Sequence, residues 1–209
     1  MSTPKNPFSL AHWRRSVAAL YADVRATSGH DPVHAAQTFR AGRDRLFAEH
    51  PDSPISHAKR AAWRGAGWYP YDPAWRVTGR LRLEDHVETF DIALASDGLL
   101  RCAHVATVDF EAAGTAARLA VYWLCGYGGG LWLPFADATN GRGTYAGGRY
   151  LYDTIKGADL GAHMDELLLD FNYAYNPSCA YDDCWSCPLS PPENRLPFAV
   201  AAGERAPPA

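Results

Sequence analysis

Residues 167–195 read LLLDFNYAYNPSCAYDDCWSCPLSPPENR, and this stretch carries the clearest strand pattern in the chain. Successive side chains of a strand point to opposite sides, so an extended segment over 167–175 would place large apolar and aromatic residues on one face. The other face would carry Asp170, Asn172 and Asn176. Two interpretations of that polar face stay open. It meets water, as in most antiparallel sheets, or it points into a cleft where Asp170 and Asn172 orient a ligand.

Similar alternation appears upstream of this stretch and predicts further strands. The helical period disappears from Val77 onward, and the predicted strands lie near residues 89–94, 99–110, 115–123, 131–135 and 150–154. Asp97–Gly98 and Asn140–Gly141 are typical of the short turns between antiparallel strands. No helical pattern of crossover length lies between the strands, which argues against a parallel sheet. We therefore expect a mainly β (α+β) fold, an antiparallel β-sandwich or partly closed barrel of about seven or eight strands.

The N-terminal region has a helical period instead. Apolar residues recur at spacings of three and four after Ser9, which we expect to cap the first helix. Asp31–Pro32 predicts the start of a second helix that ends before Pro51. The expected solvated face of that helix carries Arg40, Arg43 and Arg45.

The length of 209 residues fits one structural domain. Within it we expect an N-terminal helical segment over 1–60, packed on an antiparallel β domain over 61–209. Residues 1–76 carry 11 Lys/Arg and 6 Asp/Glu, whereas residues 77–209 carry 9 and 17. A basic helical part docked on an acidic β part accounts for this asymmetry.

Composition also limits the partners. The net charge of −3 gives no global reason to expect nucleic acid. There is no apolar run of the ~20 residues that a membrane span needs, and Arg14–Arg15 interrupts any secretion signal. Five cysteines are an odd number for a disulfide framework. We expect a cytoplasmic protein with a small-molecule ligand, no nucleic-acid or membrane partner, and a homo-oligomer as an open alternative.

Three cysteines stand close together in a C-x4-C-x2-C pattern, Cys179, Cys184 and Cys187. Zinc would need a fourth ligand, and no second C-x-x-C pair or H-x3–5-H partner is present, so a metal site is disfavoured and the cofactor stays unknown. Buried structural thiols are favoured first, and a nucleophilic Cys179 second. A disulfide between Cys179 and Cys187 is conceivable but unexpected in a reducing compartment.

A glycine-rich segment over 137–153 supplies Arg149, which can bind a carboxylate or phosphate through two hydrogen bonds. The alternative is that Arg149 pairs with Asp170 or Asp153 inside the sheet. Both interpretations place Arg149 beside the strand that carries Asp170. The proline-rich exit then brings Glu193, Asn194 and Arg195 together, which suits either a site or a tie-down of the C-terminal segment.

Several of these motifs resemble those of a bacterial and archaeal family of uncharacterised proteins, a domain of unknown function. The resemblance covers residues 35–205 and rests on WYPYDPAWR, LWLPFADATNGRGTYAGGRYLYD, LLLDFNYAYNPSCAY, CPLSPPENRL and AVAAGE. No reaction is assigned to this family, so the resemblance implies none. It implies a characteristic set of matched positions: Asp137, Thr139, Thr144, Tyr145, Arg149, Asp170, Asn172, Tyr175, Asn176, Cys179, Tyr181, Cys187, Glu193, Asn194 and Arg195. Cys184 falls in a spacer between the motifs, which counts further against a three-cysteine metal site.

Two functions are consistent with this sequence. One is an enzyme that uses acid–base chemistry on a small polar or anionic metabolite bound in a β-sandwich or barrel cleft. The other is a non-catalytic small-molecule binding or structural module whose polar residues form an internal hydrogen-bond network. In the enzyme hypothesis the candidate catalytic residues are Asp170, Glu193, Cys179 and Tyr145. The candidate substrate-binding residues are Arg149, Asn172, Asn176, Asp137, Thr139 and Arg195.

Overall fold

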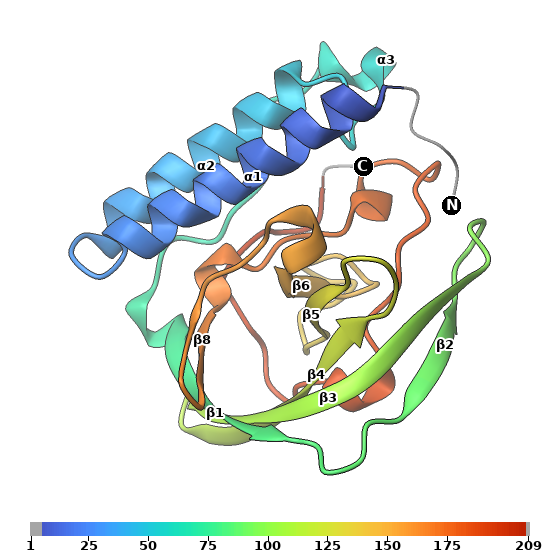
Figure 1. Cartoon of the computed structure of the whole chain (residues 1–209). Helices are drawn as coiled ribbons and strands as arrows, with labels where there is room; N and C mark the ends of the chain where they lie inside the picture. The colour runs from blue at the N-terminus through green and yellow to red at the C-terminus, as the bar shows by residue number, and fades with distance from the viewer. Residues whose placement is uncertain (1–5, 208–209) are drawn as a thin grey trace.

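The computed structural model describes residues 6–207, in which two long helices lie across an eight-stranded antiparallel sheet (Figure 1). The helices are α1 (Pro7–Thr27), α2 (Pro32–Glu49) and the short α3 (His57–Arg60). The strands are β1 (Arg76–Leu83), β2 (Thr89–Ala93), β3 (Leu99–Ala112), β4 (Thr115–Leu124), β5 (Gly130–Phe135), β6 (Arg149–Asp153), β7 (Ala162–His163) and β8 (Glu166–Asp170). Short 3-10 turns are η1 (Pro73–Trp75), η2 (Thr154–Lys156), η3 (Phe171–Tyr173), η4 (Ser178–Ala180) and η5 (Pro192–Asn194).

The sheet has the order β6-β5-β4-β3-β1-β8-β7, and β2 pairs with the first part of β3. All of these pairs are antiparallel. β3 is 14 residues long, so its first part can pair with β2 and its second part with β1. The sheet curls into a half-barrel, with β1, β2 and β3 forming its outer curve in Figure 1. The predicted mainly β class and partly closed barrel are therefore confirmed.

A short contact joins the two ends of the curled sheet, and we call it the closure seam. Tyr150 of β6 and Tyr175, which follows β8, form an isolated antiparallel bridge. Tyr150 N–H donates to the Tyr175 carbonyl at 2.9 Å, and Tyr175 N–H donates back at 3.1 Å. The Tyr152 hydroxyl adds bonds to the carbonyls of Gly161 (2.9 Å) and Leu168 (2.6 Å). These bonds satisfy backbone groups that an open sheet edge would leave unpaired.

The predicted strand over 167–175 is too long, because β8 ends at Asp170 and η3 follows. The Asp170 carboxylate accepts a bond from the Asn172 backbone N–H at 3.1 Å, and this local side-chain bond favours a turn over further strand. The turn also removes the exposed polar face. Asp170 and Asn172 are fully buried, and Asn176 is buried as well, so the interpretation in which this face meets water is wrong.

The helices begin at Asn-Pro and Asp-Pro pairs. Asp31 caps α2 as predicted, accepting from His34 N–H at 3.0 Å. α1, however, is capped by Asn6 and not by Ser9. The helix therefore begins earlier than predicted, at Pro7. α1 passes close over the loop after η2. Gly157 has φ +86°, and a Cβ there would lie 2.9 Å from the Ala18 backbone nitrogen, so only glycine permits this approach.

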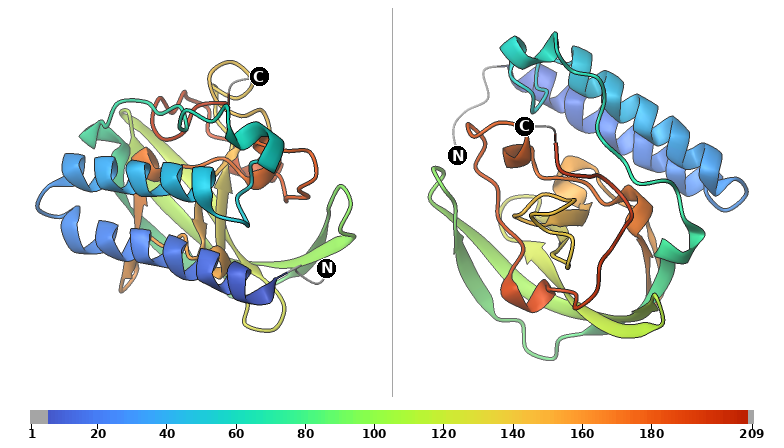
Figure 2. Two further views of the ribbon diagram at one scale, coloured as in Figure 1. Left: turned by 90° about the horizontal axis from the view of Figure 1, so that it is seen from above. Right: turned by 180° about the vertical axis from the view of Figure 1, so that it is seen from behind.

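The last part of the chain, residues 196–205, runs without regular secondary structure across the open side of the half-barrel (Figure 2), and we call it the C-terminal strap. Its backbone bonds to three separate segments. Leu196 N–H donates to Ala136 O at 2.8 Å, and Glu204 N–H to Ala174 O at 2.8 Å. Gly203 O accepts from Tyr69 N–H at 3.0 Å. The strap therefore covers the core that the curled sheet leaves open.

Asn194, at the end of η5, replaces a missing strand partner. Its side-chain oxygen accepts from Ala120 N–H at 2.7 Å, and its amide donates to Ala120 O (2.9 Å) and Pro134 O (2.7 Å). All three bonds are buried. Of the two roles considered for residues 193–195, Asn194 therefore has the structural one: its side chain fixes the C-terminal segment to the sheet.

We predict that Asn194→Ala lowers the free energy of unfolding by roughly 3 kcal/mol or more, since each buried group left unpaired costs ~1–3 kcal/mol. Urea denaturation measures it. Arg195→Ala is the control, because this neighbouring side chain is exposed and should change stability by less than about 0.5 kcal/mol. Equal effects of the two substitutions would contradict the role of Asn194.

Candidate functional site

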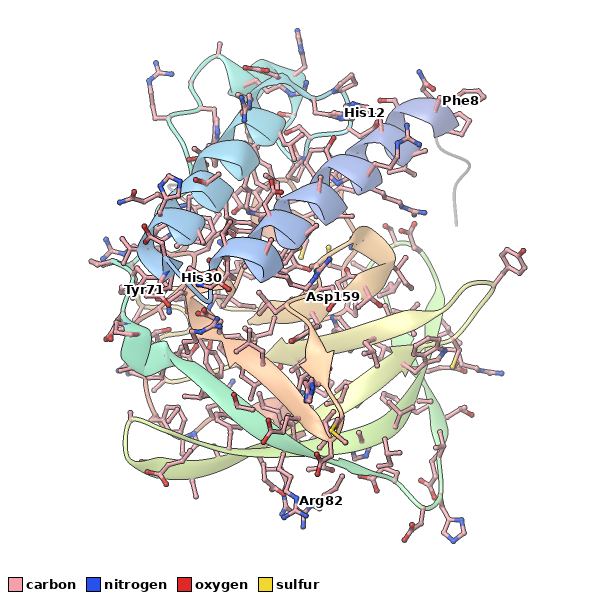
Figure 3. The ribbon with its side chains drawn as sticks, turned by 60° about the vertical axis from the view of Figure 1, so that its left-hand side comes forward. Phe8, His12, His30, Tyr71, Arg82 and Asp159 are labelled. Carbon is pink, nitrogen blue, oxygen red and sulfur yellow. The ribbon has the colours of Figure 1, made fainter. Side chains whose placement is uncertain are left out.

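A small pocket lies between the helical layer and the closure seam, and we call it the interlayer pocket. Its cavity volume is ≈ 50 Å³, which exceeds the ~10–15 Å³ that one water molecule requires and so admits a ligand of a few non-hydrogen atoms. Figure 3 shows how α1 lies over the strands that follow β6, with Asp159 directly beneath it. The lining residues are Trp13, Val17, Tyr21, Arg43, Phe47, Pro54, Tyr150, Lys156, Ala158, Tyr175, Asn176, Pro177 and Ser178.

Three residues of this lining each carry a polar atom that is buried without a hydrogen-bond partner among the described residues. These atoms are the hydroxyls of Tyr21 and Tyr175 and the side-chain oxygen of Asn176. The three residues are 2%, 9% and 2% exposed. A buried polar group without a partner costs ~1–3 kcal/mol, so three around one cavity indicate a place that a polar molecule would complete. Burial raises the pKa of both tyrosines, so both hydroxyls stay protonated and can donate.

The charges in the pocket wall are already paired. Arg43 Nε lies 2.5 Å from Glu204 Oε1, which ties α2 to the C-terminal strap. Glu204 also accepts from Asn176 N–H at 2.7 Å and from the Tyr181 hydroxyl at 2.8 Å. Burial lowers the pKa of Arg43, but the attraction of Glu204 outweighs it and the pKa rises. Lys156 lies 3.3 Å from Asp153. With both cations neutralised, the pocket suits a neutral ligand better than an anion.

One residue beyond Ser178, three side chains form a second feature, the thiol cluster of Tyr145, Cys179 and Cys187. The Tyr145 hydroxyl lies 3.6 Å from Cys179 Sγ, and Cys179 N–H donates to Cys187 Sγ at 3.4 Å. A hydrogen bond from the Cys187 thiol, helped by Tyr145 and by the charge of Lys156, lowers the pKa of Cys179 to about 6. The same bond and burial raise the pKa of Cys187. Cys179 is therefore a thiolate at neutral pH.

Asp170 and Asn172 lie elsewhere, under η1 and the start of β1. Asp170 accepts from the Asn172 side chain at 2.9 Å and pairs with Arg76 at 3.4 Å. Asn172 also bonds both backbone groups of Asp72, at 3.0 and 2.9 Å. Burial raises the pKa of Asp170 against these bonds. The guanidinium beside Asp170 is thus Arg76, and the expectation that Arg149 lies beside this strand is wrong.

Arg149 is fully buried and pairs with Asp137, not with Asp170 or Asp153. Its Nη2 donates to Asp137 Oδ2 and to Val200 O, both at 2.9 Å. Its Nη1 donates to Ala202 O and Glu204 O. The other oxygen of Asp137 accepts from Thr139, from its backbone at 2.8 Å and its hydroxyl at 2.6 Å. These groups hold the C-terminal strap, and of the Arg149 donors only Nε is without a partner among the described residues.

The remaining two candidates lie on the outside of η5. Glu193 is exposed and accepts from the Tyr122 hydroxyl at 2.7 Å. The Arg195 side chain is exposed, while its backbone bridges Ala136. The predicted set is therefore divided. The structure brings Asn176, Cys179 and Tyr145 to one region and places Asp170 with Asn172, Asp137 with Thr139 and Arg149, and Glu193 with Arg195 in separate positions.

The sequence interpretation missed three residues of the pocket, Tyr21, Arg43 and Lys156, and named Tyr175 only as a matched family position. Tyr21 follows Val17 by four residues, so the helical spacing of α1 could have predicted that it is buried. Arg43 was expected on a solvated face, which is wrong, because its side chain is only 11% exposed and pairs with Glu204. Nothing in the local sequence of Lys156 indicates its position. Across residues 6–207, no group of three or more His, Cys, Asp or Glu side chains is arranged to hold a metal ion.

Together, the fold and this pocket define a curled antiparallel half-barrel with a helical cover and a small polar cavity at its seam. The chain belongs to the family described as "Protein of unknown function (DUF1684)", whose model matches residues 61–205. It is similar to the solution NMR structure of the uncharacterized protein from gene locus rrnAC0354 of Haloarcula marismortui. The two share 35% identity with a TM-score of 0.62, over 85% of this chain and 96% of that chain.

The sequence matches no curated protein. The resemblance to an uncharacterised family is thus confirmed, and with it comes no reaction. In the part of the chain that the structure describes, no helix is long and apolar enough to cross a membrane.

We predict that Arg149→Ala lowers the free energy of unfolding by ~3–5 kcal/mol, because it leaves the Asp137 carboxylate buried without its countercharge. Guanidinium denaturation measures the loss. Arg142→Ala is the matched control, since that arginine is exposed on the same loop. A stable Arg149→Ala protein would show instead that this guanidinium is free for a ligand.

For Cys179 we predict an alkylation rate with iodoacetamide that rises through a midpoint near pH 6, because the thiolate is the reactive form and its fraction grows as pH passes the pKa. Cys187→Ala removes the hydrogen bond that favours the thiolate, so the midpoint should move upward. Peptide mass spectrometry separates Cys179 from Cys184, which is exposed and has a raised pKa. An unchanged midpoint in Cys187→Ala would refute the pairing.

Proposed function

We propose that this chain is an enzyme that binds a small polar molecule in the interlayer pocket and carries a reactive group, the Cys179 thiolate, beside it. The observation that carries the proposal is the set of three partnerless buried atoms, on Tyr21, Tyr175 and Asn176, around one cavity. Ser178 lines the pocket, and Cys179 is the next residue in the chain.

The chemistry of the lining residues restricts the class of ligand that the pocket can bind. The Asn176 oxygen can only accept, so the molecule must donate a hydrogen bond there, as a hydroxyl or amino group does. The two tyrosine hydroxyls can donate or accept. Paired cations and a cavity of ≈ 50 Å³ favour a compact, neutral molecule over an anionic one. The substrate class is therefore a small hydroxy or amino compound.

The proposed acid–base role falls to the thiol cluster. A Cys179 thiolate with a pKa of about 6 can accept a proton or act as a nucleophile near neutral pH. Tyr145, 3.6 Å from the sulfur, can donate a hydrogen bond to it. Lys156 lines the pocket and its positive charge favours the thiolate. We propose a cytoplasmic location, where these thiols stay reduced.

The second hypothesis, an internal hydrogen-bond network, is favoured for one part of the polar set. Asp137, Thr139 and Arg149 bond to one another and to the carbonyls of the C-terminal strap. We assign stability, not ligand binding, to these three residues. A buried ion pair in which only Arg149 Nε is without a partner among the described residues has few groups to offer a substrate.

We predict that Tyr21→Phe and Tyr175→Phe abolish ligand binding without lowering the stability of the free protein. Each removes a hydroxyl with no protein partner, so folding loses no hydrogen bond. A thermal-shift screen against small hydroxy and amino compounds measures this, since a ligand at 100 times its Kd adds about 2.7 kcal/mol.

Tyr173→Phe is the matched control, because its hydroxyl is also buried without a partner but does not line the interlayer pocket. It should keep the ligand response of the unmodified protein. A response that survives Tyr21→Phe and Tyr175→Phe, or is lost in Tyr173→Phe, would place the binding site elsewhere.

A further inference from the structure

The thiol cluster has a feature that ligand binding alone does not use, a second cysteine in contact with the first. Cys187 lies on the segment that returns from the loop over 180–186, and its sulfur accepts the Cys179 backbone N–H at 3.4 Å. The Cys187 thiol is also the main cause of the lowered pKa of Cys179. Both residues are half-buried, both are free thiols, and both are reachable from solvent. With the Cys187 sulfur in contact with the Cys179 backbone, a bond between the two sulfurs requires little movement of the chain.

The other three cysteines differ from this pair. Cys102 is fully buried in the core of the sheet. Cys125 directly follows β4, and its thiol donates a hydrogen bond to the carbonyl of Trp123. Cys184 is exposed on the loop between the pair, and its N–H bonds to Asp182. Cys184 is therefore a natural control: it lies on the same loop, but it does not share the contact between Cys179 and Cys187.

We propose that Cys179 and Cys187 form a dithiol that reduces hydroperoxides, with Cys179 as the attacking thiol and Cys187 as the resolving thiol. The inference uses the same thiolate as the proposed function but does not depend on the interlayer pocket. A hydroperoxide is small, and the sulfur of Cys179 is approached by the Tyr145 hydroxyl, a hydrogen-bond donor for the oxygen that leaves.

The reaction balances in two steps. The Cys179 thiolate attacks the terminal oxygen of R–O–O–H, the O–O bond breaks, and the departing alkoxide takes a proton from solvent to give an alcohol and a Cys179 sulfenic acid. The Cys187 sulfur then attacks the sulfenic sulfur. The S–S bond forms, the S–O bond breaks, and the hydroxide leaves with the Cys187 thiol proton as water. The peroxide gains two electrons, the two thiols lose them, and an external dithiol restores the pair.

Several groups support the first step. Cys187 donates to the Cys179 sulfur and stabilises its thiolate, which is the form that attacks a peroxide. Lys156 contributes positive charge from η2. The resolving thiol stays protonated until it reacts, since its pKa is raised. The pair thus has the asymmetry that a resolving reaction needs.

The test uses the full-length reduced protein and one equivalent of hydrogen peroxide. We expect an intact-mass loss of ~2 Da, the loss of two titratable thiols and reversal by dithiothreitol, as disulfide formation requires. Cys184→Ser should behave like the unmodified protein. Cys187→Ala should instead accumulate a sulfenic acid that dimedone traps on Cys179, and Cys179→Ser should consume peroxide at least ~10-fold more slowly.

Two results would overturn the proposal. One is a disulfide that persists in Cys179→Ser or disappears in Cys184→Ser, which would assign the oxidation to the exposed loop cysteine. The other is peroxide consumption by the unmodified protein no faster than by Cys179→Ser. Tyr21→Phe and Tyr175→Phe should keep the peroxide reaction, so a failure of pocket binding and a failure of the dithiol are distinguishable.

Discussion

A fully buried guanidinium, that of Arg149, determines how the half-barrel is completed. The curled sheet leaves one side of its core open, and the C-terminal strap covers it without forming a strand. Arg149 bonds to three carbonyls of the strap and to Asp137, so one side chain supplies the donors that a neighbouring strand would otherwise supply. Asn194 does the same for Ala120 and Pro134. These bonds hold in place the C-terminal strap, which includes Glu204.

Glu204 in turn connects the strap to the interlayer pocket. It pairs with Arg43 of α2, accepts the backbone N–H of Asn176, and accepts the Tyr181 hydroxyl. The helices are therefore held on the barrel by an ion pair as well as by packing. This arrangement separates two kinds of buried polar group. Those of the strap network, apart from Arg149 Nε, have protein partners and explain stability, whereas the Tyr21 and Tyr175 hydroxyls and the Asn176 oxygen have none, which supports the proposed ligand.

Much of the sheet could be predicted because alternation is a local property, visible in segments such as 99–110 and 115–123. The break after Asp170 was not visible, because it depends on a side chain that bonds the backbone two residues on. The partner of Arg149 was misassigned for a different reason. Asp137, Asp153 and Asp170 are all plausible in sequence, and only the register of β5 with β6 selects among them. The pocket combines α1, α2, η2 and the seam, whose convergence no local pattern encodes.

Tyr181 connects the loop between the two cysteines to Glu204 and to Asn176, a residue of the pocket. This residue lies on the segment between Cys179 and Cys187, and its hydroxyl donates to Glu204 Oε2 at 2.8 Å. The Asn176 side chain also reaches that hydroxyl, at 3.5 Å. A disulfide between the two cysteines would close residues 179–187, and Tyr181 with them, into a ring. Because buried Glu204 loses a hydrogen bond only at a cost of ~1–3 kcal/mol, its bond to Tyr181 stabilises the observed position of the loop between the two cysteines.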